Sequence, residues 1–566
     1  MKKLLLLFSI INCQLLIVNC YAQTLDWATG MGSTDADAGM GVGVDALGNV
    51  YTCGTFNGTV DFDPGVNTVN MSAGSYTSIF IQKSDADGNF IWAKRIICST
   101  DMQVGEIQVD PAGNSYITGC FNSATNFDIG NSSYFISSVG EKDAFVAKYN
   151  TDGDLVWAKA IGGINDDIGR SVFVDNAGNT YSTGTFSGTI DADPGTGTYN
   201  LTNQGLGSGY VQKLDANGDF VWAIMNTRVG AGIQCFSIEA DAQGNVYVGG
   251  AFSGTMNFNL AGSGFNLTAV GSYDIFVQKL DSDGNFVWAK RAGAENLDYC
   301  RSIALGEAND VYLTGFFNNT VDFDPGIGIA NLASAGGNDS YVLKLDTAGN
   351  FKWAKKTGST GSEMGERICY QSGTIYSVGS FYNTVDFNPN AGTVSYTATG
   401  TYPDAYIQQL DTSGNYVWSA TFGDVQRDEA YGVHADGLEN IYITGRYNGT
   451  VDFDPGPNTV NLTATTGTVG DVFVQKLTSI VISAEENKVH EFMLYPNPAS
   501  TSIGIQSMVN NQWSLVSIYN TQGQLVLTTS NINNQTLNIE NLIPGLYYLH
   551  LQSAEGVGVK KFEVIK

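Results

Sequence analysis

The stretch SVFVDNAGNTYSTGTF at residues 171–186 decides the fold that we predict. It holds two short runs rich in β-branched and aromatic residues, 171–175 and 180–186, and the turn Asn176-Ala-Gly-Asn179 lies between them. Runs of this length that flank an Asn/Gly turn predict a β-hairpin. Residues 171–186 therefore supply the first two strands of a small antiparallel sheet.

A second hairpin of the same kind completes each unit. Just before the stretch quoted above, residues 143–148 read DAFVAK, the turn Asp152-Gly-Asp154 follows, and residues 155–159 read LVWAK. These segments predict a third and a fourth strand. Four short antiparallel strands in one unit are typical of a β-propeller blade.

The unit recurs about every 65 residues, and the recurrence predicts the architecture. Seven tryptophans mark the fourth strands, and a Tyr-x-x-Gly-x-aromatic pattern marks the second strands seven times. The tryptophans are Trp27, Trp92, Trp157, Trp222, Trp288, Trp353 and Trp418, and the tyrosines are Tyr51, Tyr116, Tyr181, Tyr247, Tyr312, Tyr376 and Tyr442. We therefore predict an all-β fold with a seven-bladed β-propeller of about 65-residue repeats at residues 24–480.

The two ends of the repeat array complement each other. The last repeat stops after residues 471–477 without a Trp-bearing fourth strand, whereas Leu25-Asp26-Trp27-Ala28 precedes the first complete repeat. The N-terminal segment can therefore supply the outermost strand of the last blade, which would close the ring and leave no exposed sheet edge. The alternative, a linear solenoid, would instead need polar capping repeats.

The repeats resemble a known bacterial family. Their pattern Asp-x-x-Gly-Asn-x-Tyr, combined with Trp-Ala-Lys, is similar to the β-propeller repeats called SBBP repeats across roughly residues 24–480. The resemblance implies the propeller fold and names no ligand or activity.

The N-terminus predicts export. Residues 1–22 begin with Met1-Lys2-Lys3, continue with a largely apolar run and end in Cys20-Tyr21-Ala22, which is the plan of a secretory signal peptide. We expect cleavage after Ala22; acylation of Cys20 is the alternative, which the preceding Asn19 disfavours. No later apolar run is long enough for a transmembrane segment.

A different pattern follows a polar linker, which we place at residues 481–490. Alternating runs at 513–519 and 524–528 predict a small Ig-like β-sandwich at residues 491–566. The motif residues Tyr495, Pro496, Asn497, Pro498, Gly545, Lys560 and Lys561, with the turn at 520–523, resemble the type A C-terminal sorting domain of the type IX secretion system. The resemblance implies the type IX secretion machinery as a partner and a secreted or outer-membrane cell-surface location. The alternative is an ordinary Ig-like accessory domain.

Composition excludes several function classes. Lys and Arg total 27 against 55 Asp and Glu, so a net charge of −28 disfavours nucleic acid and anionic lipid as partners. The cysteines form no CxxC pair and do not recur within each unit, which favours small buried side chains over a disulfide or metal framework.

The sequence predicts no catalytic residue and no certain cofactor. His434 is the one histidine of the repeats and lies in a predicted first strand, where a core role is favoured. Irregular segments at 226–228 and 363–367 could supply an Arg and a Glu to an enzyme site, but ordinary loop drift is favoured. Five lysines that stand nine residues before a Trp predict scaffolding between blades: Lys83, Lys148, Lys213, Lys279 and Lys344.

The candidate metal site lies in the loops between the second and third strands. Four loops carry two aspartates separated by one residue and followed by Pro-Gly: Asp61 and Asp63, Asp191 and Asp193, Asp322 and Asp324, Asp452 and Asp454. Alternate residues of an extended segment point to one side, so each loop could present two carboxylates to Ca²⁺ while Phe62 or its equivalent turns inward. The alternative is that Asp-Pro-Gly is an ordinary turn.

Three functions remain open from the sequence. We favour a non-catalytic surface binding or adhesion module for a glycan or protein ligand. The alternatives are a secreted glycan-active enzyme, either a lyase or a hydrolase, and a structural surface-layer protein. Architecture alone does not choose among them.

Overall fold

The computed structural model describes residues 20–100, 102–128, 133–203, 207–226, 232–260, 262–466, 469–482, 492–507, 515–521, 523–529, 536–553 and 556–565. These residues form strands, turns and loops and contain no helix. Among them there is accordingly no helix that could cross a membrane. Most of the predicted signal peptide, and residues 483–490 of the predicted linker, lie outside the described residues.

The chain divides into two compact units: a repeat unit, Thr24–Thr478, and a C-terminal unit that begins at Ser479. The strands of both units belong to small sheets of two to six strands, and none of these sheets closes on itself into a barrel.

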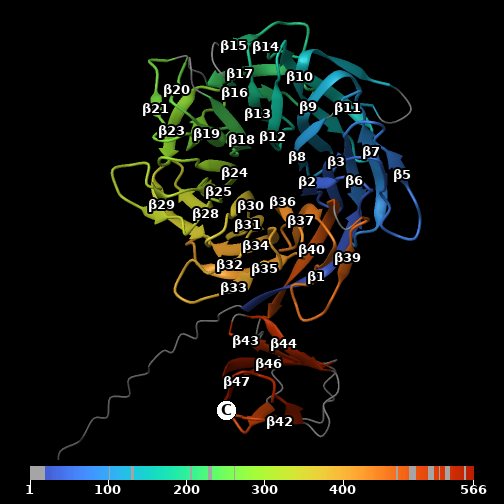
Figure 1. The fold of residues 1–566 in the computed structure, drawn as a ribbon, viewed down its shortest axis with the longest axis vertical. Coiled ribbons are helices and arrows are strands. Elements are labelled where there is room, and N and C mark those ends of the chain that lie inside the picture. Colours follow the sequence, from blue (N-terminus) through green and yellow to red (C-terminus); the bar gives the residue numbers. More distant parts are fainter. Residues whose placement is uncertain are drawn as a thin grey trace, which may run out of the picture. The chain divides into compact units, whose positions relative to one another are not determined.

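Seven antiparallel sheets make up most of the repeat unit, and six of them have four strands from one repeat (Figure 1). The first has β2 (Ala38–Val44), β3 (Val50–Phe56), β6 (Ser78–Ser84) and β7 (Phe90–Ile96); the second has β8 (Gln103–Val109), β9 (Ser115–Asn126), β10 (Phe135–Tyr149) and β11 (Leu155–Gly163). The third has β12 (Ile168–Val174), β13 (Thr180–Phe186), β16 (Ser208–Leu214) and β17 (Phe220–Asn226); the fourth has β18 (Ile233–Ala240), β19 (Val246–Phe252), β22 (Asp274–Leu280) and β23 (Phe286–Ala292). The fifth has β24 (Tyr299–Leu305), β25 (Val311–Phe317), β28 (Asp339–Leu345) and β29 (Phe351–Thr357); the sixth has β30 (Met364–Gln371), β31 (Thr374–Phe381), β34 (Asp404–Asp411) and β35 (Tyr416–Phe422).

The seventh sheet combines the two ends of the repeat array. It has the strand order β1-β40-β37-β36, where β36 (Glu429–Ala435), β37 (Ile441–Tyr447) and β40 (Asp471–Ile482) come from the last repeat and β1 (Cys20–Met31) from the N-terminal end. The N-terminal strand thus takes the outer place beside β40 that the complementary ends predict.

Short two-stranded hairpins lie in the loops between second and third strands. They are β4 (Thr59–Asp61) with β5 (Asn70–Ser72), β14 (Thr189–Asp191) with β15 (Asn200–Thr202), β20 (Thr255–Asn257) with β21 (Asn266–Thr268), β26 (Thr320–Asp322) with β27 (Asn331–Ala333), β32 (Thr384–Asp386) with β33 (Ser395–Thr397), and β38 (Thr450–Asp452) with β39 (Asn461–Thr463). Through β14, one of these hairpins also extends the second sheet.

The first strands of the seven sheets contact one another in succession, from β2 through β8, β12, β18, β24 and β30 to β36, and β36 contacts β2. Figure 1 shows them around the middle of the repeat unit. Apolar side chains fill the space between neighbouring sheets: one core cluster joins Cys53 and Ile81 to Ile107 and Ile117 of the next sheet. Another joins Val42 of the first sheet to Val474 of the seventh.

The repeated glycine of the second strand has a steric cause. Each first strand carries a register shift, as between Gly39 and Gly41, and there its backbone approaches the second strand closely. A Cβ atom on Gly54 would collide with the carbonyl oxygen of Ala38, and the equivalent glycine of each repeat faces the same collision. The Gly of the Tyr-x-x-Gly-x-aromatic pattern is therefore required by the bulge of the neighbouring strand.

The C-terminal unit consists of two antiparallel sheets around one apolar core. One sheet has β41 (Phe492–Tyr495), β42 (Ser502–Ser507) and β45 (Thr536–Asn538); the other has β44 (Leu525–Thr529), β43 (Leu515–Asn520), β46 (Gly545–Ser553) and β47 (Gly556–Val564). Buried residues of both sheets, among them Ile503 and Leu549, share the core.

Candidate functional site

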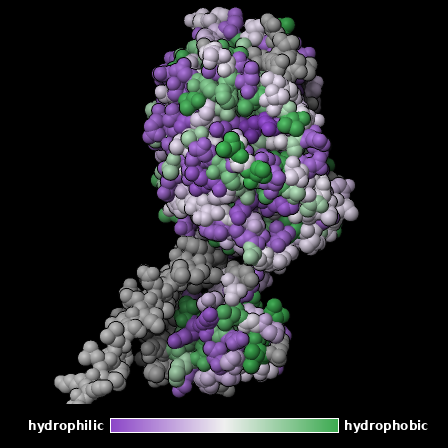
Figure 2. All heavy atoms as spheres, turned by 90° about the vertical axis from the view of Figure 1, so that its left-hand side faces the viewer, coloured by the Kyte–Doolittle hydropathy of each residue, from purple (hydrophilic) through white to green (hydrophobic). Residues whose placement is uncertain are grey.

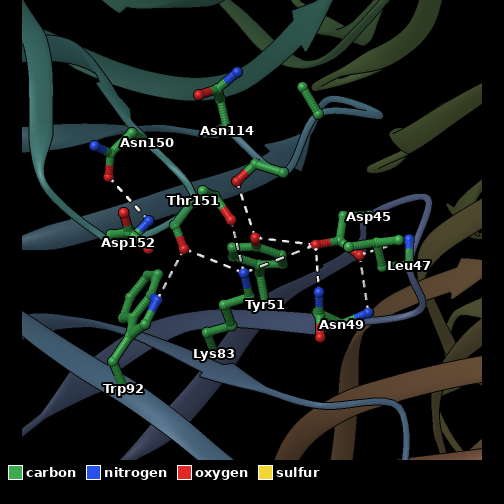
Figure 3. A network of polar contacts seen from close by, with 12 residues as sticks. Asp45, Leu47, Asn49, Tyr51, Lys83, Trp92, Asn114, Asn150, Thr151 and Asp152 are labelled. Atoms are coloured by element: carbon green, nitrogen blue, oxygen red, sulfur yellow. Dashed lines mark hydrogen bonds and ion pairs between the residues drawn. The ribbon is translucent and has the colours of Figure 1, made fainter.

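The most regular polar residues of the repeats join one sheet to the next (Figure 3). The Nε1 of Trp92 donates a hydrogen bond to the carbonyl oxygen of Thr151, 3.1 Å away in the turn of the second sheet. Lys83 Nζ donates to the same oxygen at 3.1 Å and lies 4.8 Å from the ring centre of Tyr51. The Tyr51 hydroxyl in turn donates to Gly113 O, also in the second sheet, and to Asp45.

The same tryptophan bond occurs at six junctions. The donors are Trp27, Trp92, Trp157, Trp222, Trp288 and Trp353, and each acceptor is a carbonyl in the turn of the following sheet. Trp418 has no equivalent acceptor, because β40 and β1 of the seventh sheet come from opposite ends of the array and no turn connects them.

The five predicted scaffold lysines, together with Lys476, each lie over the tyrosine of the same sheet at 4.8–5.9 Å. These contacts agree with the predicted structural role, which explains why the residues recur.

The predicted calcium ligands are engaged by their own loops. Asp61 Oδ1 accepts hydrogen bonds from the backbone N–H groups of Asp63, at 3.1 Å, and Val69, at 2.8 Å, while Asp63 Oδ1 accepts from Gly65 N at 2.8 Å. The pairs Asp191 and Asp193, Asp322 and Asp324, and Asp452 and Asp454 make the same bonds. Such side-chain bonds to nearby backbone are the usual role of Asp in tight turns.

Two other repeats show that this role needs no negative charge. Asn126 Oδ1 accepts from Asp128 N and Tyr134 N at 3.2 and 3.0 Å, and Asn257 Oδ1 accepts from Asn259 N and Phe265 N, both at 2.9 Å. Phe62, between the two aspartates of its loop, is fully buried, as the alternation predicts. In the part of the chain that the structure describes, no three His, Cys, Asp or Glu side chains gather as a metal site would require. The calcium site stays a prediction, and a cation there would compete with three backbone donors.

A cavity of about 200 Å³ lies among the first strands of the sheets. It is lined mainly by β2, β8, β24, β30 and β36, with Glu239 contributed by β18. The side chains with chemical capability on its wall are Glu106, Glu239, Arg367, Cys369 and His434. At the first-strand position of Glu106 and Arg367 the sequence departs from its own repeat.

An ion pair crosses the cavity wall between two distant repeats. Arg367 Nη1 lies 3.0 Å from Glu106 Oε1, although 261 residues separate them. In three other repeats the matching first-strand position is a serine whose hydroxyl accepts a backbone N–H of the next first strand: Ser171, Ser237 and Ser302. In the first and seventh sheets it is Gly41 or Gly432. The replacement of Ser by Glu and Arg is the sequence signal that would have revealed this site.

Of the two acids of this cavity, Glu106 is paired with Arg367, whereas Glu239 makes no hydrogen bond or ion pair with the described residues. Burial raises its pKa well above the ordinary value, with the charge of Glu106 adding to the effect and that of Arg367 opposing it. Three other charged first-strand residues are in ion pairs: Arg301 with Glu366 at 3.7 Å, and Glu429 with Arg446 of β37 at 2.8 Å. Burial lowers the pKa of His434. His434 also lines the cavity, so the predicted core role does not describe its whole environment.

A second set of buried acids lies where the sheets meet, away from this cavity. In the fifth sheet Asp339 is paired with Lys356 at 3.1 Å, and in the fourth sheet Asp274 is paired with Arg291. The equivalent Asp404 of the sixth sheet has Thr421 at the register position of Lys356, and its Oδ1 has no hydrogen-bond partner. Burial raises the pKa of Asp404 to about 7.

The acids that face the equivalent aspartates of the other sheets, and Asp428, which faces Asp404, are perturbed in the same way. Burial raises the pKa of Asp37 and Asp167 to about 7 and that of Asp428 to about 8. Asp428 accepts hydrogen bonds from the backbone of Asp424 and Asn448, and the nearby charge of Asp404 raises its pKa further. Burial therefore favours the protonated form of these acids up to near-neutral pH.

The sorting motif comes together at β47 of the C-terminal unit. Asn497 Nδ2 donates to the carbonyl oxygen of Lys561 at 3.3 Å, and Asn497 Oδ1 accepts from Glu563 N at 2.9 Å. These bonds tie the turn of Tyr495, Pro496 and Pro498 to the strand that carries Lys560. Gly545 pairs with Val564 of the same strand. The Tyr495 to Pro498 segment thus lies at β47 with motif residues that follow it by 47 to 66 positions in the chain.

Residues 493–566 match the family model described as "Secretion system C-terminal sorting domain". Among the curated relatives, the uncharacterized WD repeat-containing protein L264 of Acanthamoeba polyphaga mimivirus is 22% identical over 509 residues, which cover 75% of this chain and 36% of that protein. Beta-agarase A of Zobellia galactanivorans is 28% identical over 166 residues, which cover 26% of this chain and 31% of that enzyme. The chain spans only about a third of the length of these two relatives.

Similar solved structures are remote. A subtype N10 neuraminidase-like protein of A/little yellow-shouldered bat/Guatemala has a TM-score of 0.31 at 9% identity, covering 82% of this chain and 100% of that one. A rhamnogalacturonan lyase, PL11, of Bacillus licheniformis has a TM-score of 0.25 at 10% identity, covering 95% and 91%. Neither likeness carries an argument about activity. What the findings establish is a repeat-rich all-β protein whose residues 493–566 are a type IX secretion sorting domain.

Proposed function

We propose that this protein is an exported, non-catalytic binding module whose seven sheets form a closed seven-bladed β-propeller. Support for closure comes from the unbroken succession of first-strand contacts and from the pairing of β1 with β40. In this proposal the repeats are of the SBBP type. The signal peptide at residues 1–22 directs the first step of export, and the sorting domain directs the last. The product acts at the cell surface or outside the cell.

The observation that carries a binding role is the difference between the recurring residues, which are structural, and the exposed loop residues, which vary. Recurring Trp, Tyr, Lys and Asp side chains hold sheets and loops together. The loops that they support carry, at their tips, exposed residues that differ from repeat to repeat, among them Val66 and Ile327. On the face of the repeat unit in Figure 2, apolar side chains lie in small groups among polar ones. A polar ligand such as a glycan suits such a surface better than a large apolar partner does.

An array of glycans and matrix proteins, probed with the mature chain, tests the proposal. Selective binding that persists at raised salt would support an adhesion module. A blank array would overturn it. Probing once with Ca²⁺ and once with chelator decides whether the Asp61 and Asp63 loops and their equivalents take part through a cation.

One observation favours a glycan-active enzyme as the second candidate. Glu106 is paired with Arg367, whereas Glu239 in the same cavity has no such partner and burial raises its pKa, so the two carboxyls stand in different electrostatic environments. Pairs of acids with separated pKa values are how glycosidases divide acid and base roles. A polysaccharide digestion screen in which wild type releases fragments and E239Q does not would replace the binding proposal with this one.

A further inference from the structure

The cavity among the first strands continues into a second, larger cavity of about 680 Å³. The two share the lining residues Gln371, His434 and Ala435. The outer cavity is formed by turns of the first, second and seventh sheets together with Lys476. Together they reach the size range of small-molecule sites, roughly 300–1,000 Å³.

One carboxyl of the inner cavity, which is the cavity among the first strands, has no cationic partner among the described residues. Its wall carries two carboxyls, Glu106 and Glu239, but one guanidinium, Arg367, which is already bonded to Glu106. His434 does not make up the difference, because burial favours its neutral form. Lys476 of the outer cavity is itself paired with Asp26 at 2.8 Å and donates to Ala86 O at 3.0 Å.

The outer cavity is apolar at its rim. Leu47 is 84% exposed and Leu438 is 82% exposed, and both line this cavity. They stand in the turns of the first and seventh sheets, where the second and third repeats carry Ala112 and Ala177 at the matching position. Exposed leucines that the second and third repeats lack, and that stand on two adjacent sheets, suit a contact with an apolar group rather than a role in the repeat.

From this arrangement we propose that the two cavities form one binding site for a small ligand with a cationic amine at one end and an apolar group at the other. The amine pairs with Glu239 in the inner cavity, and the apolar end lies against Leu47 and Leu438. Glu239 is suited to this role because burial favours its neutral form while it has no partner, and an ammonium beside it stabilises the carboxylate, so that the carboxyl proton is released to solvent on binding. The site is separate from the variable loops of the proposed adhesion function.

Calorimetric titration of the full chain with phenethylamine tests the proposal. Phenethyl alcohol and phenylacetate have the same ring without the positive charge, and ethanolamine has the amine without the ring. We expect phenethylamine to bind about tenfold or more tightly than each of the three. Equal binding of the neutral or anionic analogue, or no binding of phenethylamine, would overturn the proposal.

Variants locate the site. E239Q keeps the shape and removes the charge, and we expect it to weaken phenethylamine binding about tenfold or more. E307Q removes a charge from the exposed turn between β24 and β25 and serves as the matched control, with affinity unchanged. L438S should weaken phenethylamine and leave ethanolamine unaffected. Thermal melts confirm that each variant is folded, and E239D, which retains the charge, should retain binding. Equal affinity in E239Q and wild type would refute the site whatever the glycan array shows.

Discussion

Replacing Asp61 distinguishes a calcium-binding role of the Asp-rich loops from a structural role in which the aspartates bond only their own backbone. In D61A the N–H groups of Asp63 and Val69 both lose their acceptor. At about 0.5–1.5 kcal/mol for each hydrogen bond, the unfolding free energy should fall by about 1–3 kcal/mol. In D61N the remaining side-chain oxygen can accept both bonds, as Asn126 and Asn257 do in their own loops. We therefore expect D61N to stay within about 0.5 kcal/mol of wild type.

Urea unfolding followed by tryptophan fluorescence measures this difference. Seven of the eight tryptophans lie in the repeats, so the signal reports mainly on the repeat unit. D87N, at an exposed turn residue, controls for the loss of one negative charge. Each protein is measured in Ca²⁺ and in chelator. If D61N is as unstable as D61A and Ca²⁺ stabilises only the wild type, the charge of Asp61 matters and the loop-capping argument is refuted.

Three further predictions concern stability and one concerns export. Acids such as Asp37, Asp167 and Asp428 keep their protons up to about pH 7–8 in the folded state, whereas the unfolded chain releases them near pH 4. The contribution of these acids to the free energy of unfolding is therefore fully present below about pH 4 and is lost as pH rises to about 8. Each such group contributes up to about 1.4 kcal/mol per pH unit, and a melting temperature that rises from pH 5 to pH 8 would contradict this. T421K should place an ammonium beside Asp404, as Lys356 stands beside Asp339, and raise the melting temperature more at pH 8 than at pH 5; K356T should do the reverse. W92F loses its bond to Thr151 and should cost about 1 kcal/mol, more than W418F, which has no such bond to lose; equal costs in urea unfolding would show that the bond contributes nothing. A chain that ends at residue 480 should remain inside the outer membrane in cell fractionation, since it lacks the sorting domain at 493–566; its appearance in the medium would disprove that role.

Much of the architecture could be read from the sequence because the repeat is strict. Each repeat must build the same sheet and the same junction, so the Trp spacing of about 65 residues and the Gly of the second strand recur at every copy. The complementary ends of the array likewise predicted the place of β1 beside β40. The C-terminal motif identified the sorting domain for the same reason: its residues are local and characteristic.

The candidate sites depended on the tertiary structure. Whether the oxygens of Asp61 face a ligand or their own loop depends on the path of the backbone between Asp61 and Val69, which the residue types leave open. Glu106 and Arg367 meet only because the first strands of the second and sixth sheets approach the same cavity. Residues that recur stabilise the repeated sheets and their junctions, and their regular spacing is visible in the sequence. The residues that differ, here Glu106, Glu239 and Arg367, acquire their chemistry from neighbours more than a hundred residues away, and only folding brings those neighbours together.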